Sequence, residues 1–377
     1  MHTLNLGPNE QLIDASTDLF EANVATPALC LDRPQLMANI QSMQAAATAA
    51  GAALRPHMKA HKCSLIAQLQ SEAGAIGVCC ATAQEAEIAA AAGVGSILIT
   101  TPVVSPMVLE RLVALARRGV ELLMAVDTVE GIDRVADAAD GTRIGTLIDI
   151  NVGQNRTGIS EPQDAVRLAQ HIAGSPSLEL RGVQAYYGHL QHVPALVDRR
   201  TRIEQQLPRL RAILAQLQAD GHSIEIVSGG GTGTAALDLQ TGLFTEIQPG
   251  SYLFLDSQYA AVELGPIPID FSLSVLGRIT STAVTGQAVV DIGTKALSTD
   301  PGLIRLMSSD AGSPTHNFMG DEHSVLAFAN PSDVPPVGTL VRLAATHCDP
   351  TVNLHDRYLV LESGRLIDIW PIEARGY

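Results

Sequence analysis

The strongest constraint on the fold is an alternation of short β-branched runs with Ala/Leu-rich amphipathic segments between residues 54 and 250. This alternation is typical of βαβ units, in which helices join parallel strands. Eight strands are predicted, at 54–59, 76–82, 96–101, 121–127, 146–152, 180–187, 225–228 and 245–248. Eight regular units predict a (β/α)8 TIM-like barrel, because open parallel sheets usually contain only about five to seven strands.

The chain changes character after Pro266. Strand-like runs follow at 271–282, 288–292, 324–329, 339–346 and 357–372, and no helix is predicted between them. The run 25–32 predicts an extra strand, which either pairs with this C-terminal sheet or enters the barrel. We therefore expect an α/β chain with a barrel over residues 26–262. A second, all-β domain is expected from residues 1–25 together with 263–377.

Charge, hydropathy and cysteine content exclude several functional classes. The chain has 24 basic and 39 acidic residues, a formal charge of -15 and no basic run, so no nucleic-acid partner is expected. Glycine and proline interrupt the longest apolar stretch, 88–104, so no membrane segment is predicted. The five cysteines form no CxxC pair, and residues 1–17 show no secretory pattern. These features favour a reducing compartment, and we expect a cytoplasmic protein.

The first predicted barrel strand runs into a cluster of cations, RPHMKAHK at 55–62. Residues two apart in a strand share a face, so Arg55, His57 and Lys59 are expected to project together at the carboxyl end of this strand. Cationic neighbours disfavour the charged form of Lys59, and a Schiff-base nucleophile requires a neutral amine. The alternative is a basic surface turn between strand and helix.

Two glycine-rich turns follow the seventh and eighth predicted strands, GGGTGT at 229–234 and PGSY at 249–252. Glycine lets backbone N–H groups approach an anion closely, and hydroxyl side chains add donors. Barrels frequently bind phosphate after these two strands. The turns therefore indicate a small phosphorylated cofactor or substrate, with simple tight turns as the alternative. The sequence lacks a GK[ST] motif, so a nucleotide P-loop is not predicted.

Further side chains suited to catalysis follow later strands. His347 and Asp349 are two apart at a predicted strand end, and an imidazole with a carboxylate suits a divalent ion such as Mn²⁺ or Zn²⁺. The alternative is a hydrogen-bonded His–Asp turn. His189 and His192 follow the sixth strand as candidate general bases. Arg156 follows the fifth strand and is a candidate for binding an anionic oxygen.

Together, the PHxKxHK segment, the GGGTGT and PGSY turns, and HCDPTxNxHD followed by IxPIxARG resemble the D-threonine aldolase branch of the alanine-racemase-like, fold type III pyridoxal-phosphate (PLP) enzymes. The likeness spans nearly the whole chain. It implies a PLP-bearing barrel with a β-domain, a homodimer, and a divalent metal beside the cofactor. Mn²⁺ is the first choice for this metal, with Mg²⁺, Co²⁺ and Zn²⁺ as alternatives.

The resemblance also implies roles for single residues. Lys59 matches the Schiff-base lysine, and Arg156 matches the arginine near the pyridoxal 3-oxygen. His192, the last residue of QAYxGxxQH, matches the base of the family, with His189 as the alternative. His347 and Asp349 match the metal pair. The other residues expected to bind the cofactor are Tyr187, Gly230, Gly231, Thr232, Gly250, Ser251 and Tyr252.

The function implied is retro-aldol cleavage of a small D-3-hydroxy-α-amino acid to glycine and an aldehyde. The first alternative is a dehydratase acting on D-serine or D-3-hydroxyaspartate by β-elimination. Such dehydratases typically carry His-x-Cys where this chain has His-Cys-Asp, so the sequence favours the aldolase. A non-catalytic PLP-binding protein is disfavoured, because those proteins generally lack the β-domain. A metal-dependent sugar-phosphate barrel enzyme without PLP is the remaining alternative.

Overall fold

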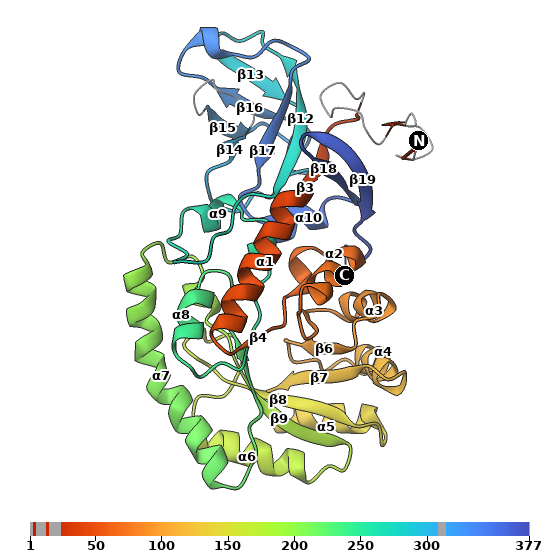
Figure 1. Ribbon diagram of the computed structural model, residues 1–377, viewed down its shortest axis with the longest axis vertical. Coiled ribbons are helices and arrows are strands. Elements are labelled where there is room, and N and C mark those ends of the chain that lie inside the picture. Colours follow the sequence, from red (N-terminus) through yellow and green to blue (C-terminus); the bar gives the residue numbers. More distant parts are fainter. Residues whose placement is uncertain (1–2, 5–12, 15–23, 308–313, 377) are drawn as a thin grey trace.

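The computed structural model describes residues 3–4, 13–14, 24–307 and 314–376. Two units lie one above the other along the long axis of the molecule, a barrel with surrounding helices and a second unit built mainly of strands (Figure 1). Among the described residues, none of the helices combines the length and the hydropathy that a bilayer crossing needs.

The first unit contains all eight predicted barrel strands. Each strand pairs in parallel with its neighbour in the order β4-β11-β10-β9-β8-β7-β6-β5. A parallel bridge between His57 and Cys79 joins the two ends, so the sheet closes. The predicted TIM-like barrel is thereby confirmed. The strands are β4 (Ala53–Leu54), β5 (Val78–Cys80), β6 (Ser96–Ile99), β7 (Glu121–Val126), β8 (Ile144–Asp149), β9 (Leu178–Ala185), β10 (Ile226–Gly229) and β11 (Glu246–Ile247).

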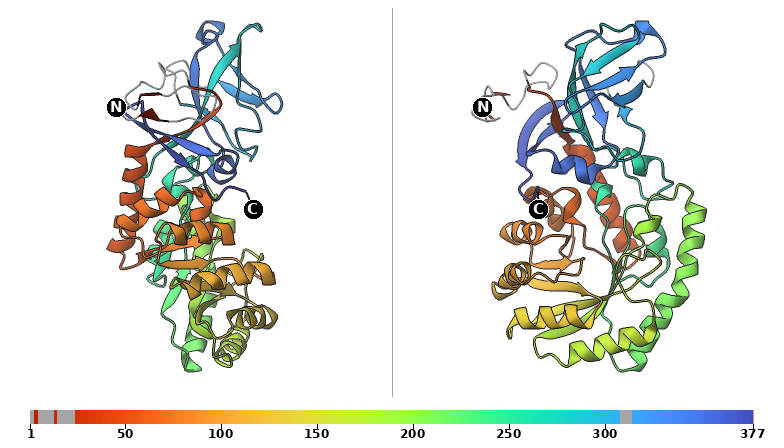
Figure 2. Two further views of the ribbon diagram at one scale, coloured as in Figure 1. Left: turned by 90° about the vertical axis from the view of Figure 1, so that its right-hand side faces the viewer. Right: turned by 180° about the vertical axis from the view of Figure 1, so that it is seen from behind.

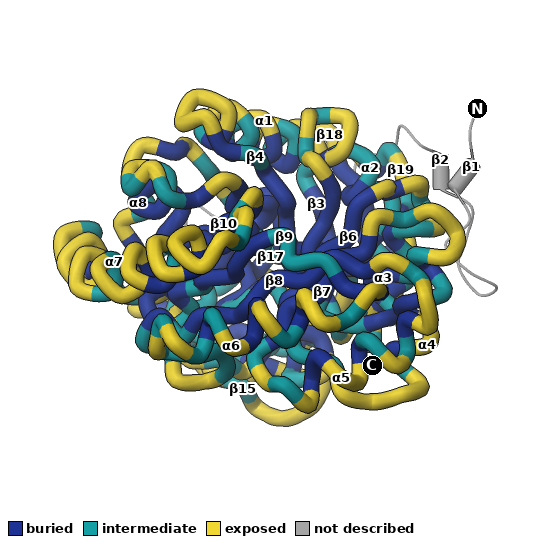
Figure 3. The backbone as a smooth tube through the Cα atoms, turned by 90° about the horizontal axis from the view of Figure 1, so that it is seen from below, coloured by how far each residue is buried: buried dark blue, intermediate teal, exposed yellow. Residues whose placement is uncertain are grey.

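Helices surround this barrel, with exposed residues on their outer faces and buried strands at the centre (Figure 3). Local sequence signals start several of them. Asp32 and Thr82 each accept a hydrogen bond from a backbone N–H group in the first turn of the helix that follows. Proline lies in the first turn of three helices, one of which is the helix that Asp32 caps. The helices are α1 (Arg33–Ala49), α2 (Ser64–Glu72), α3 (Ala83–Ala91), α4 (Pro106–Arg117), α5 (Val129–Ala139), α6 (Pro162–Ala173), α7 (Leu196–Ala219), α8 (Ala235–Gln240) and α9 (Ser257–Ala260).

The second unit is a strand-rich sheet of nine strands. The predicted run 357–372 is a hairpin, because Ser363 and Gly364 both adopt the positive φ angles that a tight turn requires. The strands are β3 (Ala28–Asp32), β12 (Leu273–Ser281), β13 (Gln287–Val290), β14 (Arg305–Leu306), β15 (Thr315–Phe318), β16 (Ser324–Ala327), β17 (Leu340–Ala344), β18 (Arg357–Glu362) and β19 (Arg365–Pro371).

The extra strand near the N-terminus joins this second sheet. β3 pairs antiparallel with β12 and parallel with β18. β3 lies inside residues 26–262, the range predicted for the barrel, although it pairs with the second sheet. The predicted division of the chain at residues 26 and 262 stays a prediction. Of residues 1–23, the structure describes only β1 (Thr3–Leu4) and β2 (Ile13–Asp14), which pair with each other, and the rest lie outside the described residues.

The expectation that no helix lies between the strands of this unit is wrong. A short helix, α10 (Cys348–Asn353), lies between β17 and β18. Its six residues include Pro350. Proline is tolerated there because backbone N–H groups in the first turn of a helix have no acceptor within the helix, so the missing N–H of proline costs no hydrogen bond. The Thr351 hydroxyl donates to the carbonyl of His347, which precedes the helix. His347 and Asp349 therefore lie at a helix start rather than on one face of a strand.

The C-terminal residues tie the second unit back to the barrel, beside α2 (Figures 1 and 2). Glu373 accepts hydrogen bonds from the backbone and hydroxyl of Ser64, at 3.1 and 2.5 Å. Tyr358 donates to the carbonyl of His61 at 2.7 Å. These contacts hold the second unit over the segment that carries Lys59.

The barrel interior contains a buried ion pair. The Arg55 guanidinium donates to both carboxylate oxygens of Glu246 at 2.9 to 3.1 Å, and the two side chains are each 3% exposed. Ser96 and Ser228 supply further hydrogen bonds to this pair. Arg55 is therefore part of the interior and does not face the same surface as Lys59.

Removing one partner of this pair should be costly. Glu246→Ala leaves the Arg55 charge buried without its counter-ion, and we expect a loss of about 3–5 kcal/mol in the free energy of unfolding. The control is Glu179→Ala, which removes the partner of Arg143 from an exposed pair and should cost less than about 1 kcal/mol. Equal losses in urea titrations of the two variants would contradict this account.

Candidate active site

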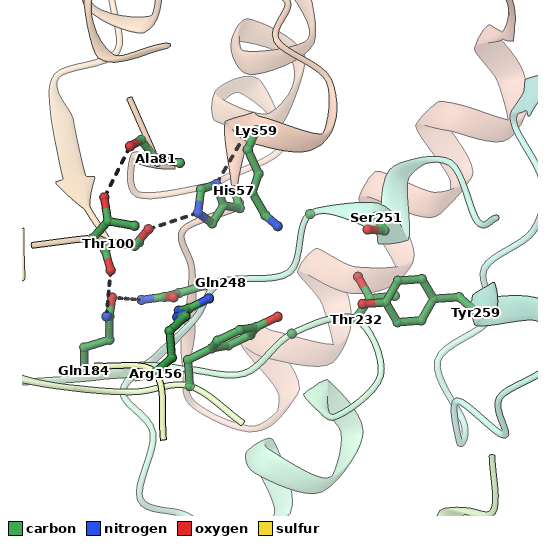
Figure 4. Close-up of a pocket in the computed structure, with 14 residues that line it drawn as sticks. His57, Lys59, Ala81, Thr100, Arg156, Gln184, Thr232, Gln248, Ser251 and Tyr259 are labelled. Atoms are coloured by element: carbon green, nitrogen blue, oxygen red, sulfur yellow. Dashed lines mark hydrogen bonds between the residues drawn. The ribbon is translucent and has the colours of Figure 1, made fainter. Parts of the chain in front are cut away.

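A cavity opens at the carboxyl ends of the barrel strands, where barrel enzymes place their active sites (Figure 4). The carboxyl ends of seven barrel strands, or the segments that follow them, contribute to its wall. The lining residues are His57, Lys59, Ala81, Thr100, Thr101, Arg156, Gln184, Tyr186, Gly231, Thr232, Gln248, Gly250, Ser251 and Tyr259.

Lys59 reaches this cavity from a short 3-10 helix, η1 (Met58–Ala60), because the regular pairing of the first strand ends before it. The His57 side chain caps η1 by accepting the Lys59 backbone N–H at 3.3 Å. Lys59 Nζ lies 3.0 Å from Asp349 Oδ2. This carboxylate is the main reason why the pKa of Lys59 is raised.

The expectation of a lysine neutralised by cationic neighbours is therefore wrong in this structure. Arg55 is paired with Glu246 in the barrel interior, and Lys62 is paired with Glu85 at 3.0 Å. Each neighbouring cation thus has its own carboxylate, and Lys59 has Asp349.

The floor of the cavity consists of hydrogen-bonded polar side chains. His57 Nε2 lies 3.1 Å from the Thr100 hydroxyl, and burial lowers the pKa of His57 well below its usual value, so its imidazole is neutral. The Gln248 amide donates to Gln184 Oε1 at 3.3 Å. Gln184 in turn donates to Asp149 at 3.0 Å. Sequence reasoning did not identify Thr100, Gln184 or Gln248, because single polar residues at strand ends carry no motif.

Arg156 lies at the mouth of the cavity on a loop that a local hydrogen-bond pattern shapes. The side-chain oxygen of Asn151 accepts the backbone N–H groups of Gly153 and Asn155, both at 3.0 Å. Asn155 adopts a positive φ of 56°, which turns the chain back toward the cavity. The Arg156 guanidinium lies 6.0 Å from the centroid of the Tyr186 ring.

The two glycine turns meet at the cavity, as their positions after β10 and β11 predict. Gly231, Thr232, Gly250 and Ser251 line it. A Cβ at Gly231 would lie 2.4 Å from Gln191 Oε1, so a larger residue cannot fit without displacing that side chain. Gly233 of the same turn is more restricted, because a Cβ there would lie 2.0 Å from the backbone oxygen of Gln191, and this close approach requires glycine.

Three residues expected in the cofactor site are not among the residues that line this cavity. Gly230 directly precedes the lining residue Gly231, and a Cβ at Gly230 would face Ile247 and Asp238. The buried Tyr252 hydroxyl accepts a hydrogen bond from Gln70 at 2.9 Å. Tyr187 packs in the core, with its ring edge-on to Phe244. The neighbouring Tyr186 lines the cavity instead, because successive side chains of β9 and its extension alternate between inside and outside.

His347 and Asp349 lie beside a second cavity that Lys59 also lines. Asp349 also touches the second glycine turn, since the Ser251 hydroxyl donates to Asp349 Oδ1 at 3.4 Å. His347 Nε2 is 3.9 Å from Asp349 Oδ1. Burial would raise the pKa of Asp349, but Lys59 and His347 together hold it below its usual range. Asp256 accepts the backbone N–H of Cys348 at 3.0 Å and so fixes the segment between the pair. In the described part of the chain, no group of three or more metal-ligating side chains forms here or elsewhere.

His192 is the histidine that lies near this pair. Its ring centroid is 6.4 Å from that of His347 and 4.5 Å from that of Tyr259. Desolvation, followed by the proximity of His347, lowers the pKa of His192, which favours a neutral imidazole able to accept a proton. His189 lies beside Gly153 and Arg202 instead.

The comparisons with known proteins agree with this architecture. Residues 31–258 match the family model "Alanine racemase, N-terminal domain", and residues 272–361 match "Putative serine dehydratase domain". The chain belongs to the alanine-racemase-like family. Within it, the chain is 38% identical to a D-threonine aldolase from Arthrobacter sp, with 94% of each chain covered.

Further relatives define the branch of this alanine-racemase-like chain. It is 34% identical to a 3-hydroxy-D-aspartate aldolase from Paracoccus denitrificans, covering 97% of this chain and 95% of the relative. It is 28% identical to a D-threo-3-hydroxyaspartate dehydratase from Delftia sp., covering 92% and 96%. The crystal structure of a D-threonine aldolase from Filomicrobium marinum superposes with a TM-score of 0.90 at 36% identity, covering 96% and 97%. The expectation of an enzyme of this lyase type is confirmed.

Behind the first glycine turn lies a buried carboxyl group, Asp238 of α8. A Cβ at Gly230 would be 3.2 Å from Asp238 Oδ2, so this group supports the turn from inside. Burial raises the pKa of Asp238 to about 8. The pKa of an aspartate in an unfolded chain is about 3.9.

Between about pH 4 and pH 8 the folded state therefore keeps the proton on Asp238, while the unfolded state loses it. The free energy of unfolding should fall as the pH rises through this range. Asp238→Asn, which mimics the protonated carboxyl, should raise the thermal unfolding temperature at pH 8 by several degrees and change it little at pH 5. Thermal unfolding at both pH values measures this, with Asp333→Asn, at a partly exposed residue of the short 3-10 helix Pro331–Asp333, as the control. A shift that is the same at both pH values would show that Asp238 does not titrate in this way.

Proposed function

We propose that this protein is a PLP- and divalent-metal-dependent aldolase that cleaves D-3-hydroxy-α-amino acids to glycine and an aldehyde. The observation that carries the proposal is the 3.0 Å contact between Lys59 Nζ and Asp349 Oδ2. It brings the amine that would bind the cofactor together with a carboxylate that would bind the metal. The aldolase relatives support the same reaction for this chain.

The residues of the first cavity fit PLP. Lys59 supplies an amine on its wall, and Gly231 and Gly250 leave backbone exposed where a Cβ would crowd its neighbours. Thr232 and Ser251 add hydroxyl donors for a phosphate group. Arg156 supplies a cation at the mouth for an anionic oxygen of the cofactor. The neutral His57 imidazole adds no charge to this wall.

The pair His347 and Asp349 fits a divalent ion. One imidazole and one carboxylate, with nitrogen and oxygen 3.9 Å apart, suit Mn²⁺ and also Mg²⁺, Co²⁺ or Zn²⁺. The pKa of Asp349 lies below its usual range, so the carboxylate is available in its charged form. Two protein ligands leave positions for water or substrate oxygen, as in catalytic metal sites.

The chemistry of the bound groups would be electron withdrawal from the substrate α-carbon by PLP and acidification of the β-hydroxyl by the metal. The chain would supply the positioning and the proton transfer. His192 would accept the proton of the β-hydroxyl, since its imidazole is neutral and lies near His347. Tyr259 packs against the His192 ring and would hold it toward the substrate. Lys59 would hold the cofactor and return as a proton donor after cleavage.

The second candidate is β-elimination by a dehydratase. The D-threo-3-hydroxyaspartate dehydratase relative and the match to a serine dehydratase domain favour it. Elimination needs removal of the α-proton and loss of the β-hydroxyl, and Lys59 and the metal pair would serve these steps as well. Asp349, where such dehydratases typically carry cysteine, supports the aldolase instead.

We also propose that the protein acts as a homodimer in the cytoplasm. The resemblance to its family supports the dimer. All five cysteines are free and buried, which supports a reducing compartment.

Identification of the products decides between the two reactions. With PLP and Mn²⁺ present, D-threonine, D-phenylserine or D-3-hydroxyaspartate should yield glycine and an aldehyde in equal amounts. Release of ammonia and a 2-oxo acid would establish the dehydratase, and no product from any of these substrates would refute both.

Substitutions should separate cofactor from metal. Lys59→Ala should abolish the visible absorbance of bound PLP and the activity. His347→Ala and Asp349→Ala should keep the absorbance and lose cleavage by roughly two to three orders of magnitude, since the metal supplies several kcal/mol of charge stabilisation. EDTA should reproduce their effect on the wild type. Full activity of either metal-pair variant would remove the metal from the mechanism.

A further inference from the structure

A second carboxylate, Asp300, contacts His347 of the metal pair from a loop of the second unit. Asp300 Oδ2 lies 3.0 Å from His347 Nδ1. The other ring nitrogen, Nε2, is the one that lies 3.9 Å from Asp349. His347 therefore presents opposite edges of its ring to two different carboxylates. Asp300 also lines the second cavity together with Lys59.

The position of Asp300 is built into the fold through Ser298. The Ser298 hydroxyl donates to Asp300 Oδ2 at 2.9 Å and accepts the Asp300 backbone N–H at 3.1 Å. The Ser298 backbone N–H donates to the Thr351 hydroxyl at 3.1 Å, and the Ser298 carbonyl accepts from Thr346 at 3.2 Å. The loop is thus anchored on both sides of His347, so Asp300 and the imidazole are held in one network.

We propose that Asp300 is a positioning residue for His347. It accepts the Nδ1–H of His347, which leaves the lone pair on Nε2 for a divalent cation and fixes the rotation of the ring. The proposal rests on the function proposed above, in which His347 and Asp349 hold the metal.

General coordination chemistry supports this role. A metal-binding histidine commonly donates its second ring N–H to a carboxylate, which fixes the tautomer and raises the basicity of the ligating nitrogen. Loss of such a partner typically weakens metal binding by about 10–100-fold. The proposed site uses two ligands from the described part of the chain, His347 and Asp349, so the orientation of each has a large effect on affinity. Asp300 Oδ2 already accepts from His347 and Ser298, so Asp300 acts through His347 in this arrangement.

The test is the affinity of the PLP-loaded protein for Mn²⁺, measured from the electron paramagnetic resonance signal of free Mn²⁺. We expect Asp300→Ala to raise the dissociation constant by about 10–100-fold. Asp300→Asn should have a smaller effect, because its amide oxygen can still accept the Nδ1–H. The control, Asp356→Ala, removes an exposed carboxylate that pairs with Arg375 and should change the constant less than about twofold.

The tautomer of His347 is a second readout, which does not depend on metal binding. In ¹⁵N NMR spectra of the metal-free protein, His347 should carry its proton on Nδ1 in the wild type and Asp300→Asn. Asp300→Ala should show a mixture of tautomers. Retained PLP absorbance and thermal unfolding establish that each variant is folded, and the nearly isosteric Asn variant keeps the test available if the Ala variant is unstable.

The outcomes separate this inference from the proposed function. If the wild type binds no Mn²⁺, or if His347→Ala binds it as tightly as the wild type, the metal role of His347 fails and the inference fails with it. If His347→Ala loses Mn²⁺ but Asp300→Ala binds it normally, the role of Asp300 alone is overturned. An equal loss in Asp300→Asn and Asp300→Ala would also overturn it, because a purely electrostatic effect would then explain both variants.

Discussion

The ion pair between Lys59 and Asp349 is the contact on which the site depends, because its two members come from different units of the fold. Lys59 follows the first barrel strand, and Asp349 lies in the first turn of α10. The Lys59 side chain is 44% exposed and that of Asp349 is 14% exposed. Because solvent reaches the amine and screens the pair, its contribution to stability is small. The importance of this pair therefore lies in the placement of an amine beside a carboxylate. Other contacts hold the two units together, namely those of Glu373 with Ser64 and of Tyr358 with His61.

This contact also divides the site into two sides. Lys59 lines both the cavity formed by the glycine turns and the cavity beside the metal pair. Groups bound on the two sides would meet at the Lys59 amine, where the reacting carbon of a substrate would have to lie. His192 adds a neutral imidazole near the metal side, and Arg156 adds a cation on the other. The barrel alone could hold a cofactor, but a second reacting group requires the strand-rich unit.

Much of the fold could be predicted from the sequence, because each barrel strand is a short β-branched run followed by a helical pattern. Lys59, the glycine turns and the pair in α10 were also predictable, since each stands in a distinctive local motif. The short helix α10 was not, because the segment around His347 and Asp349 follows a strand directly and contains Pro350. The choice between Tyr186 and Tyr187 depends on where β9 ends, and adjacent tyrosines give no signal for that.

Other parts of the site arise only from tertiary structure. Thr100, Gln184 and Gln248 belong to the ends of β6, β9 and β11, which do not pair with one another, and they meet only because the sheet closes into a barrel. Asp300 reaches His347 from a loop 47 residues away in sequence. The charge of Lys59 was mispredicted for the same reason, since the local sequence shows its cationic neighbours and not Asp349.

A crystal structure of the protein loaded with PLP and Mn²⁺, with anomalous scattering recorded for manganese, tests the central claim most directly. The account predicts electron density continuous from Lys59 Nζ into the first cavity and a manganese peak within bonding distance of both His347 and Asp349. A free Lys59 amine with PLP bound elsewhere, or manganese at a site away from this pair, would contradict it.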